Sequence, residues 1–494
     1  MIPKNQIFLL GPQSSVLVTI FFLIGCAVGP NFNRPLPPPV NQYTQDPEPT
    51  QTVAAAGRAQ QFDYGDSIAA DWWQVFNSPS LTDIIKDAVN QNRNLAAAEA
   101  RLRQSEELLR AGYGVFFPQE TASFGLVRQK FSPVQFGLGT PGKTFTLYTP
   151  QVSATYVLDV FGAQRRNVED LAAQVDYQGY TAQATYITLL GNVINAAIAQ
   201  AGYQAQIEAT GQIINIVKEQ LKLTETQATA GTVGYAGVVS LQNQLATAEA
   251  MLPPLQQNLS KTQHLLAALA GRTPGQYAPP RLALKDITLP RKLPVTLPSD
   301  LVRRRPDILA AEAQLHSASA KIGVATAALL PNVSLSAALG KNLSDLTKFF
   351  GPAGQFWNVG GNMAEPLLQG GTRWFQRKAA LEAYQASLAS YQQVVVTAFQ
   401  QVADSLRALE NDAKTLKAQT EALNAASQAL QLVKANHQAG LVNYLQILTA
   451  DNQYQQARIG VIQAQALRLQ DTAALYVALG GGWWAPGTRV AAAQ

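Results

Sequence analysis

The chain of 494 residues contains one long pattern twice, and this duplication restricts its fold more than any other feature. Residues 94–126, NLAAAEARLRQSEELLRAGYGVFFPQETASFGL, align without a gap on residues 307–339, DILAAEAQLHSASAKIGVATAALLPNVSLSAAL. Residues 230–244 align in the same way on residues 439–453. Two alignments in the same order indicate a tandem duplication of one structural unit.

We therefore divide the chain into two repeats with shorter segments around them. Residues 27–66 are rich in proline and show little periodicity, so we expect a tether along the outside of the packed structure, which would begin at Trp72 and Trp73. The division is a signal peptide at 1–25, an extended N-terminal tether at 26–70, the first repeat at 71–271, a proline-rich linker at 272–297, the second repeat at 298–480 and a C-terminal tail at 481–494.

Each repeat begins with a predicted helix that ends near a proline and is followed by strands. Alanine, leucine and isoleucine recur at helical spacing over residues 81–116 and 306–329. The segment VSLSAAL, residues 333–339, alternates apolar and polar residues as a half-buried strand does. A second strand is expected near residues 144–161 in the first repeat and 356–368 in the second. The chain would thus supply four strands.

After its strands, each repeat enters a helix far longer than those of ordinary globular domains. The helical pattern covers about residues 162–230 and 371–439, and a rise of about 1.5 Å per residue makes each helix roughly 100 Å long. A shorter helix returns after a glycine turn. The pattern predicts a thick antiparallel bundle with strands at one end and turns at the other. Pro253 and Pro254 are expected to break the first returning helix, because an interior proline removes a hydrogen bond and clashes with the preceding turn.

Four strands are too few to cross a membrane alone. Strands enter a bilayer only as a closed barrel, since an open edge leaves backbone groups unpaired in hydrocarbon, and such barrels begin at about eight strands. Either several copies of the chain close one barrel, or the strands form a small water-soluble subdomain.

The only cysteine, Cys26, follows an apolar run at residues 16–24. This run is shorter than the roughly 20 residues of a membrane-spanning helix and has the length of a signal-peptide core. The segment LIGC, residues 23–26, resembles the bacterial lipobox, in which the thiol is acylated and the chain is cut just before it. Two or more acyl chains would anchor the protein stably in a membrane. The alternative is a chance cysteine in an ordinary signal peptide.

Composition excludes several functions. Charged residues are 14% of the chain, against roughly 25% in a typical soluble domain. The formal net charge is +5, but the basic residues are scattered apart from the run 303–305, which has no interleaved aromatics, so no nucleic-acid partner is expected. His264, His316 and His437 lack partner motifs in register, and we interpret His264 and His316 as helix-face residues. We therefore expect no catalytic residues, no metal site and no cofactor.

Several segments resemble those of the outer-membrane factor family, the TolC-like efflux channels. Residues 297–340, LPSDLVRRRPDILAAEAQLHSASAKIGVATAALLPNVSLSAALG, are similar to the signature segment of that family. Residues 26–35, CAVGPNFNRP, resemble the mature start of its NodT-type lipoprotein branch. Residues 71–95, 156–166 and 365–371 match further family positions in order.

The resemblance implies a mainly α fold with a membrane β portion. Tandem-duplicated long helical hairpins would form a trimeric α-barrel in the periplasm, and four strands per chain would contribute to a shared 12-stranded β-barrel in the outer membrane of a Gram-negative bacterium. The homotrimer would be the passive exit duct of a tripartite efflux pump. It would dock with a periplasmic adaptor and an inner-membrane transporter of the resistance-nodulation-division type. The alternatives are a type I secretion or metal-efflux channel, a non-channel structural lipoprotein and a periplasmic enzyme.

The turns between the long and returning helices are the expected docking tips. The resemblance implies that they meet helical hairpins of the adaptor, although glycine also simply permits the left-handed backbone of a turn. The tips consist of Gly231, Thr232, Val233 and Gly234 in the first repeat and of Gly440, Leu441, Val442 and Asn443 in the second.

Family members commonly carry aspartates shortly after the tip glycines, as acidic rings where the helices converge. The matching positions here are Gly237, Gln446 and Thr449, none of which is acidic, and Asp451 is the only carboxylate close by. Whether Asp451 faces the lumen is left open. We expect a closed aperture held by hydrogen bonding and packing, with weak block by divalent cations.

Overall fold

A computed structural model describes residues 27–132, 134, 137, 141–365 and 367–483. The predicted signal peptide, Cys26 and most of the C-terminal tail lie outside this range. The described chain divides into two compact units, each of which contains parts of both repeats. The strand unit comprises residues 27–34, 103–177 and 311–391, and the hairpin unit comprises residues 35–102, 178–310 and 392–483.

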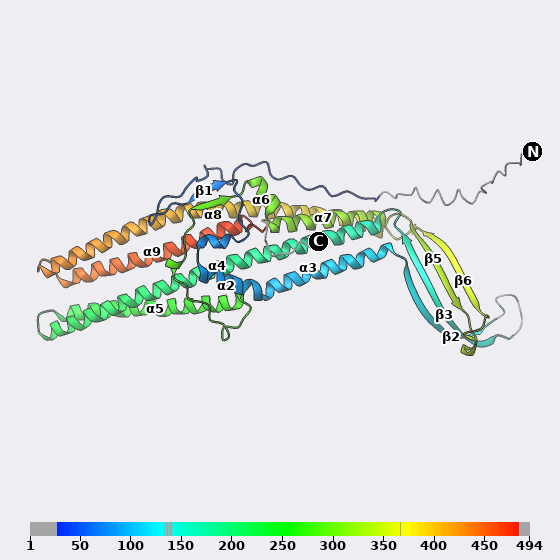
Figure 1. The fold of residues 1–494 in the computed structure, drawn as a ribbon, viewed down its shortest axis with the longest axis horizontal. Helices are drawn as coiled ribbons and strands as arrows, with labels where there is room; N and C mark the ends of the chain where they lie inside the picture. Colours follow the sequence, from blue (N-terminus) through cyan, green and yellow to red (C-terminus); the bar gives the residue numbers. More distant parts are fainter. Residues whose placement is uncertain (1–26, 133, 135–136, 138–140, 366, 484–494) are drawn as a thin grey trace, which may run out of the picture. The chain divides into compact units, whose positions relative to one another are not determined.

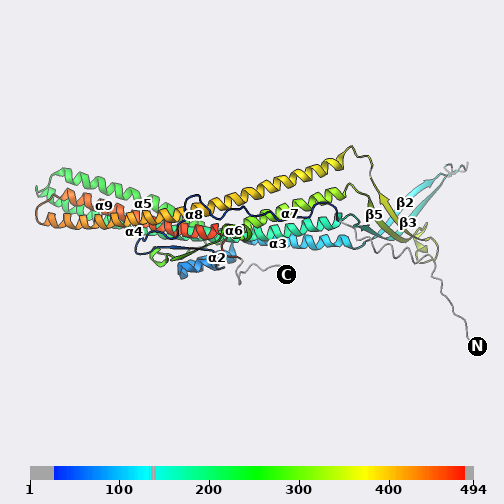
Figure 2. The ribbon, with the colours of Figure 1, turned by 90° about the horizontal axis from the view of Figure 1, so that it is seen from above.

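The strand unit contains one antiparallel sheet in the order β2-β3-β5-β6 (Figures 1 and 2). The first repeat supplies β2 and β3, and the second supplies β5 and β6, so that Ala154 on β3 pairs with Ala337 on β5 across the junction. The four predicted strands are therefore present. Their bounds are β2 Gln119–Phe131, β3 Lys143–Leu158, β5 Asn332–Lys341 and β6 Gln355–Ala364.

Long helices lead to and from this sheet. Within the strand unit, Ser317 on α7 donates to Asp170 on α4 at 2.5 Å, and Arg377 on α8 donates to Thr326 on α7 at 3.2 Å. None of the described helices is both long and apolar enough to cross a membrane. The helices that enter this unit are α3 Arg93–Gly112, α4 Ala163–Thr229, α7 Pro306–Ala327 and α8 Thr372–Gln438.

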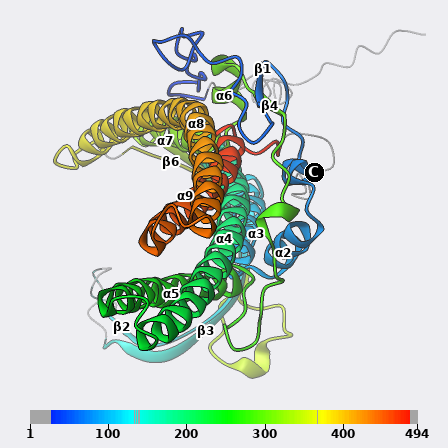
Figure 3. The same cartoon turned by 90° about the vertical axis from the view of Figure 1, so that its left-hand side faces the viewer.

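In the hairpin unit, α4 returns as α5 (Tyr235–Leu269) and α8 returns as α9 (Tyr444–Ala478) (Figure 3). The long helices have 67 residues each and the returning helices 35 each, so the two repeats produce hairpins of identical length. The ends of the two long helices lie one residue inside the predicted ranges 162–230 and 371–439. Shorter helices of this unit include α2 Pro79–Gln91, α6 Pro298–Arg304 and the 3-10 helix Trp72–Phe76.

The prediction that Pro253 and Pro254 break the returning helix is wrong, because α5 runs through both. Their side chains are exposed. The carbonyls of the preceding turn that lose their N–H partners can therefore bind water, and the helix continues.

The prediction of a single helix over residues 81–116 is also wrong, because Asn92 separates α2 from α3. Asn92 has an extended backbone. Its Oδ1 accepts from the Leu95 N–H at 2.9 Å, and its Nδ2 donates to the Leu269 carbonyl at 2.8 Å. An asparagine that satisfies backbone groups in this way competes with the helix and ends it.

The N-terminal segment packs earlier than expected. Strand β1 (Gln61–Tyr64) lies parallel to β4 (Lys292–Val295), which belongs to the segment predicted as a linker. Thr52 and Gln60 are buried. The expectation that packing begins at Trp72 is therefore wrong, although Trp72 is buried and stacks on Tyr476 with ring centroids 4.9 Å apart.

Candidate functional site

The two tips share one backbone geometry. Gly231 and Gly440 have φ of +70° and +74°, a left-handed conformation that glycine adopts without strain. The residue after each glycine donates its N–H back into the long helix, Thr232 to the Gln227 carbonyl at 3.0 Å and Leu441 to the Asn436 carbonyl at 2.9 Å. These bonds satisfy carbonyls at the helix end. The tips are therefore defined turns.

The second tip has two polar contacts that the first lacks. The Asn443 side chain accepts from the Gln446 N–H at 3.3 Å, whereas Gly234 has no side chain to cap α5. His437 Nδ1 lies 3.0 Å from the Val442 carbonyl. Sequence reasoning missed this position of His437, and its spacing of five residues from Val442 was the only signal for it.

Apolar side chains are exposed at both tips. Tyr235 is 71% exposed at the first tip, and Leu441 and Leu445 are 74% and 56% exposed at the second. Val233 and Val442 are half-buried. Exposed apolar groups of this kind suit contact with a partner helix.

The aperture residues point in different directions. Gln446 and Thr449 are exposed, Gly237 is half-buried and Asp451 is only 2% exposed. Asp451 therefore does not share the exposed face of Gln446 and Thr449. It lines a cavity of about 430 Å³ between α5 and α9. Burial raises the pKa of Asp451 against the opposing effects of Lys434 and a hydrogen bond from Gln455.

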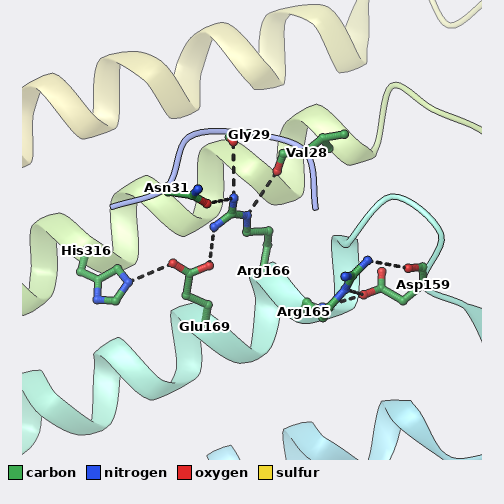
Figure 4. Close-up of polar contacts among 8 residues, drawn as sticks. All are labelled: Val28, Gly29, Asn31, Asp159, Arg165, Arg166, Glu169 and His316. Atoms are coloured by element: carbon green, nitrogen blue, oxygen red, sulfur yellow. Dashed lines mark hydrogen bonds and ion pairs between the residues drawn. The ribbon is translucent and has the colours of Figure 1, made fainter. Parts of the chain in front are cut away.

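A third group of contacts fixes the residues that follow Cys26. Arg166, near the start of α4, is 5% exposed and directs its guanidinium at the N-terminal segment (Figure 4). Its Nε donates to the Val28 carbonyl at 3.2 Å, and its Nη2 donates to the Gly29 carbonyl at 3.4 Å and to Asn31 Oδ1 at 2.8 Å. Two of these three acceptors are backbone carbonyls, so the guanidinium holds the backbone of residues 28–31 against α4.

Acidic and aromatic groups complete this contact. Arg166 Nη1 pairs with Glu169 Oε2 at 2.7 Å, and His316 Nε2 lies 3.0 Å from Glu169 Oε1 (Figure 4). Burial raises the pKa of Glu169, but the hydrogen bonds from Arg166 and His316 outweigh it, and the net shift is downward. Phe32 stacks on His316 with ring centroids 4.4 Å apart. The interpretation of His316 as an ordinary helix-face residue is therefore incomplete.

Glycines permit the close approach of the segment. Gly29 has φ of +94°, and a Cβ there would collide with the Gly323 backbone. A Cβ at Gly162 would lie 2.5 Å from the Ala27 Cα. Sequence reasoning missed Arg166 as a contact residue, and its place in the family-like segment 156–166 was the only signal.

Within the described residues, no three histidine, cysteine or acidic side chains are grouped so that they could hold a metal ion.

A family model described as outer membrane efflux protein matches residues 84–272 and again residues 297–481. The chain belongs to this family. Its function is efflux, and its location is the outer membrane. The family resemblance and the fold class are thus confirmed, and each match falls on one of the two hairpin-forming halves.

Curated relatives cover most of this efflux protein. It is 28% identical over 425 residues to the pyoverdine export outer membrane protein OpmQ of Pseudomonas putida, which covers 84% of this chain and 88% of OpmQ. It is 26% identical over 472 residues to the probable outer membrane lipoprotein SilC of Salmonella typhimurium, covering 94% and 97%. The solved outer-membrane channel OprN superposes with a TM-score of 0.82 at 27% identity, covering 93% of this chain and all of OprN.

Proposed function

We propose that three copies of this efflux protein form a passive exit duct of a tripartite pump. The strand unit carries this proposal. Its sheet has two unpaired edges, β2 and β6, and exposed edges of this length invite pairing with another chain. Twelve strands from three copies would remove every edge, which is the condition for a sheet to enter hydrocarbon.

The side chains of the sheet support a membrane location. Trp357, Val359 and Met363 on β6 are 70% to 76% exposed, and Leu126 and Leu339 on β2 and β5 are about 60% exposed. A water-soluble subdomain would leave this apolar surface in water, whereas a lipid-facing barrel surface requires it.

We further propose that Cys26 is the acylated N-terminus. Arg166, which pairs with Glu169, holds residues 28–31 in place, and these residues follow Cys26 directly in the sequence. Mass spectrometry of the mature protein should show an N-terminal acyl mass on Cys26. An unmodified outer-membrane protein that retains residues 1–25 would contradict the proposal.

We assign adaptor docking to the two tips. Their exposed apolar residues and defined turns are suited to receive helical hairpins of a periplasmic adaptor, whose inner-membrane transporter, of the resistance-nodulation-division type, would supply the energy. We assign the duct itself no catalytic step.

The cargo class is proposed to be small organic compounds. The test compares a strain that lacks this protein with the same strain carrying the wild-type gene, by accumulation of ethidium. Accumulation should rise on deletion and fall on complementation. Unchanged ethidium levels together with new copper or silver sensitivity would favour metal efflux instead, and loss of a secreted protein would favour type I secretion.

A further inference from the structure

The two repeats correspond residue by residue within the strand unit. Helix α3 begins at Arg93 and α7 at Pro306, an offset of 213 positions. Strands β2 and β5, which begin at Gln119 and Asn332, have the same offset. Each position in α3 and β2 therefore has a counterpart 213 positions further along the chain, in α7 or β5.

The second half of each repeat has an offset of 209 positions. The starts of α4 and α8 differ by this number. So do Thr155 on β3 and Ala364 on β6, which pair with the corresponding residues Gln119 and Asn332. Strand β6 is therefore the counterpart of β3, and α8 is the counterpart of α4.

The chain contains one junction between its repeats, and its two free edges match that junction. Inside the chain, β3 pairs with β5, and Ala154 lies opposite Ala337. The edge strands β6 and β2 are the counterparts of β3 and β5. We propose that β6 pairs with β2 of the next copy in the register of the internal junction, which places Met363 opposite Phe124 of the next copy. The proposal rests on the trimer of the proposed function and specifies how its copies join.

The apolar face of the sheet supports this register independently. Met363 and Trp357 on β6 are 70% and 76% exposed, and Phe124 and Leu126 on β2 are 58% and 59% exposed. The pairings through β3 and β5 place all four side chains on the same face of the sheet. The proposed register continues this face from one copy to the next. A slip of one residue would turn the apolar side chains of the next copy to the opposite face.

The helices beside the sheet have the same relation. Inside the chain, Ser317 on α7 donates to Asp170 on α4 at 2.5 Å. Their counterparts are Gln104 on α3 and Ala379 on α8, and both are exposed. The proposal therefore places Gln104 of the next copy beside Ala379, so that α3 and α8 meet at the border between copies.

The residues that hold the N-terminal segment are not repeated at this border. The counterparts of Arg166 and Glu169 are Phe375 and Lys378. Phe375 cannot donate to backbone carbonyls as Arg166 does to those of residues 28–29. Its side chain is 63% exposed in the single chain, and an exposed aromatic group of this kind suits a protein contact. The border between copies is therefore covered by Phe375, in place of an N-terminal segment.

Paired cysteines test the strand register in the full-length protein in a nonionic detergent. Met363→Cys with Phe124→Cys, and Ala364→Cys with Ser123→Cys, place thiols directly opposite each other. One of two adjacent pairs is of the closer, non-hydrogen-bonded kind. Within one chain β2 and β6 are three strand spacings apart, about 14 Å, which is too far for a disulfide. Oxidation with copper phenanthroline should therefore give covalent trimers, measured by electrophoresis in SDS without reductant.

Exchanged combinations of the same four positions are the matched controls. Met363→Cys with Ser123→Cys, and Ala364→Cys with Phe124→Cys, bring thiols together only if the register slips by one residue. They should give at least about fivefold less covalent trimer, because their thiols point to opposite faces and cannot be bridged without backbone movement. Each single-cysteine variant measures any background reaction of Cys26.

A separate pair tests the helix contact. Ala379→Cys with Gln104→Cys changes exposed residues only and should also give covalent trimers. Within one chain α4 and α7 separate α3 from α8, so this disulfide joins two copies. Ala379→Cys with Glu106→Cys is its control and should not react, because Glu106 lies on the other side of α3 from Gln104.

The outcomes separate the register from the trimer itself. Covalent trimers from the exchanged strand pairs, and none from the direct pairs, would overturn the register. Absence of any strand disulfide in a protein that native electrophoresis shows to be trimeric would also overturn it, while the proposed exit duct would stand. A monomeric wild-type protein would overturn both. If the strand variants do not assemble, the helix pair decides, and its failure to react contradicts the proposal.

Discussion

The two helical hairpins have helices of the same lengths, but their returning helices bury different kinds of side chain. Both join a helix of 67 residues to one of 35 through a left-handed glycine. The described buried residues of α5 are all apolar, whereas α9 buries Asp451, Gln455, Arg468 and Thr472. The lengths of the helices and the conformation of the turns are therefore the same in the two repeats. The buried side chains differ between the returning helices, since α9 buries polar groups and α5 does not, whereas in the first hairpin polar residues such as Gln200 and Thr210 are buried on the long helix α4.

The largest expected effect tests whether the two tips act alike. Val233→Asp and Val442→Asp each place a charge on a half-buried apolar site at a tip, and desolvating that charge would oppose adaptor docking. Each variant should reduce efflux to the level of the strain that lacks the protein, while the trimer and its outer-membrane location remain. Ethidium accumulation and native electrophoresis are the measurements.

Val53→Asp, at an exposed valine of the N-terminal segment, serves as the control and should leave efflux unchanged. Loss of efflux in only one tip variant would show that the adaptor distinguishes the hairpins. Loss of the trimer in either variant would show that the valine is needed for assembly and not for adaptor docking.

The second effect concerns pH and should occur in the second hairpin. The pKa of Asp412 is raised from 3.8 to about 7, chiefly by burial. The folded protein then binds more protons than the unfolded chain between about pH 4 and 7, so stability falls as pH rises through this window. Asp412→Asn should remove this dependence and flatten the thermal midpoint between pH 4 and 8. Parallel profiles for the wild type and the variant would contradict the assignment.

A smaller effect is expected from the caps of the returning helices. Asn443→Ala removes the side chain that accepts from the Gln446 N–H and should destabilise the start of α9 by about 1 kcal/mol. Gly234→Asn should stabilise the start of α5 by only a few tenths of a kcal/mol. Hydrogen exchange of the first-turn amides measures both. Equal exchange at the starts of α5 and α9 in the wild type would contradict the claim that the Asn443 cap stabilises α9 alone.

The smallest effect is expected at the aperture. Because Gln446 and Thr449 are neutral and exposed while Asp451 is buried, magnesium should block the conductance only weakly, and the conductance should vary little between about pH 5 and 8. Strong block that disappears in Asp451→Asn would instead show an acidic ring at the aperture.

Much of the fold follows from local sequence, because the repeats, the glycine turns and the strand alternation act over a few residues. The failures have nonlocal causes. Asn92 ends α2 through a bond to Leu269, and β1 pairs with a strand some 230 residues away that no local pattern marks. The tip residues could be located from sequence, whereas the contacts of Arg166 and Arg468 depend on distant segments. The continuity of α5 at Pro253 depends on solvent exposure.

The central claim is that three copies of this protein make a water-filled duct, and recording from the purified trimer in planar lipid bilayers tests it most directly. Stepwise conductance of one unit size, without any nucleotide, is the predicted result. A lipid-free protein that stays soluble without detergent and produces no conductance steps would contradict the claim and favour a structural lipoprotein.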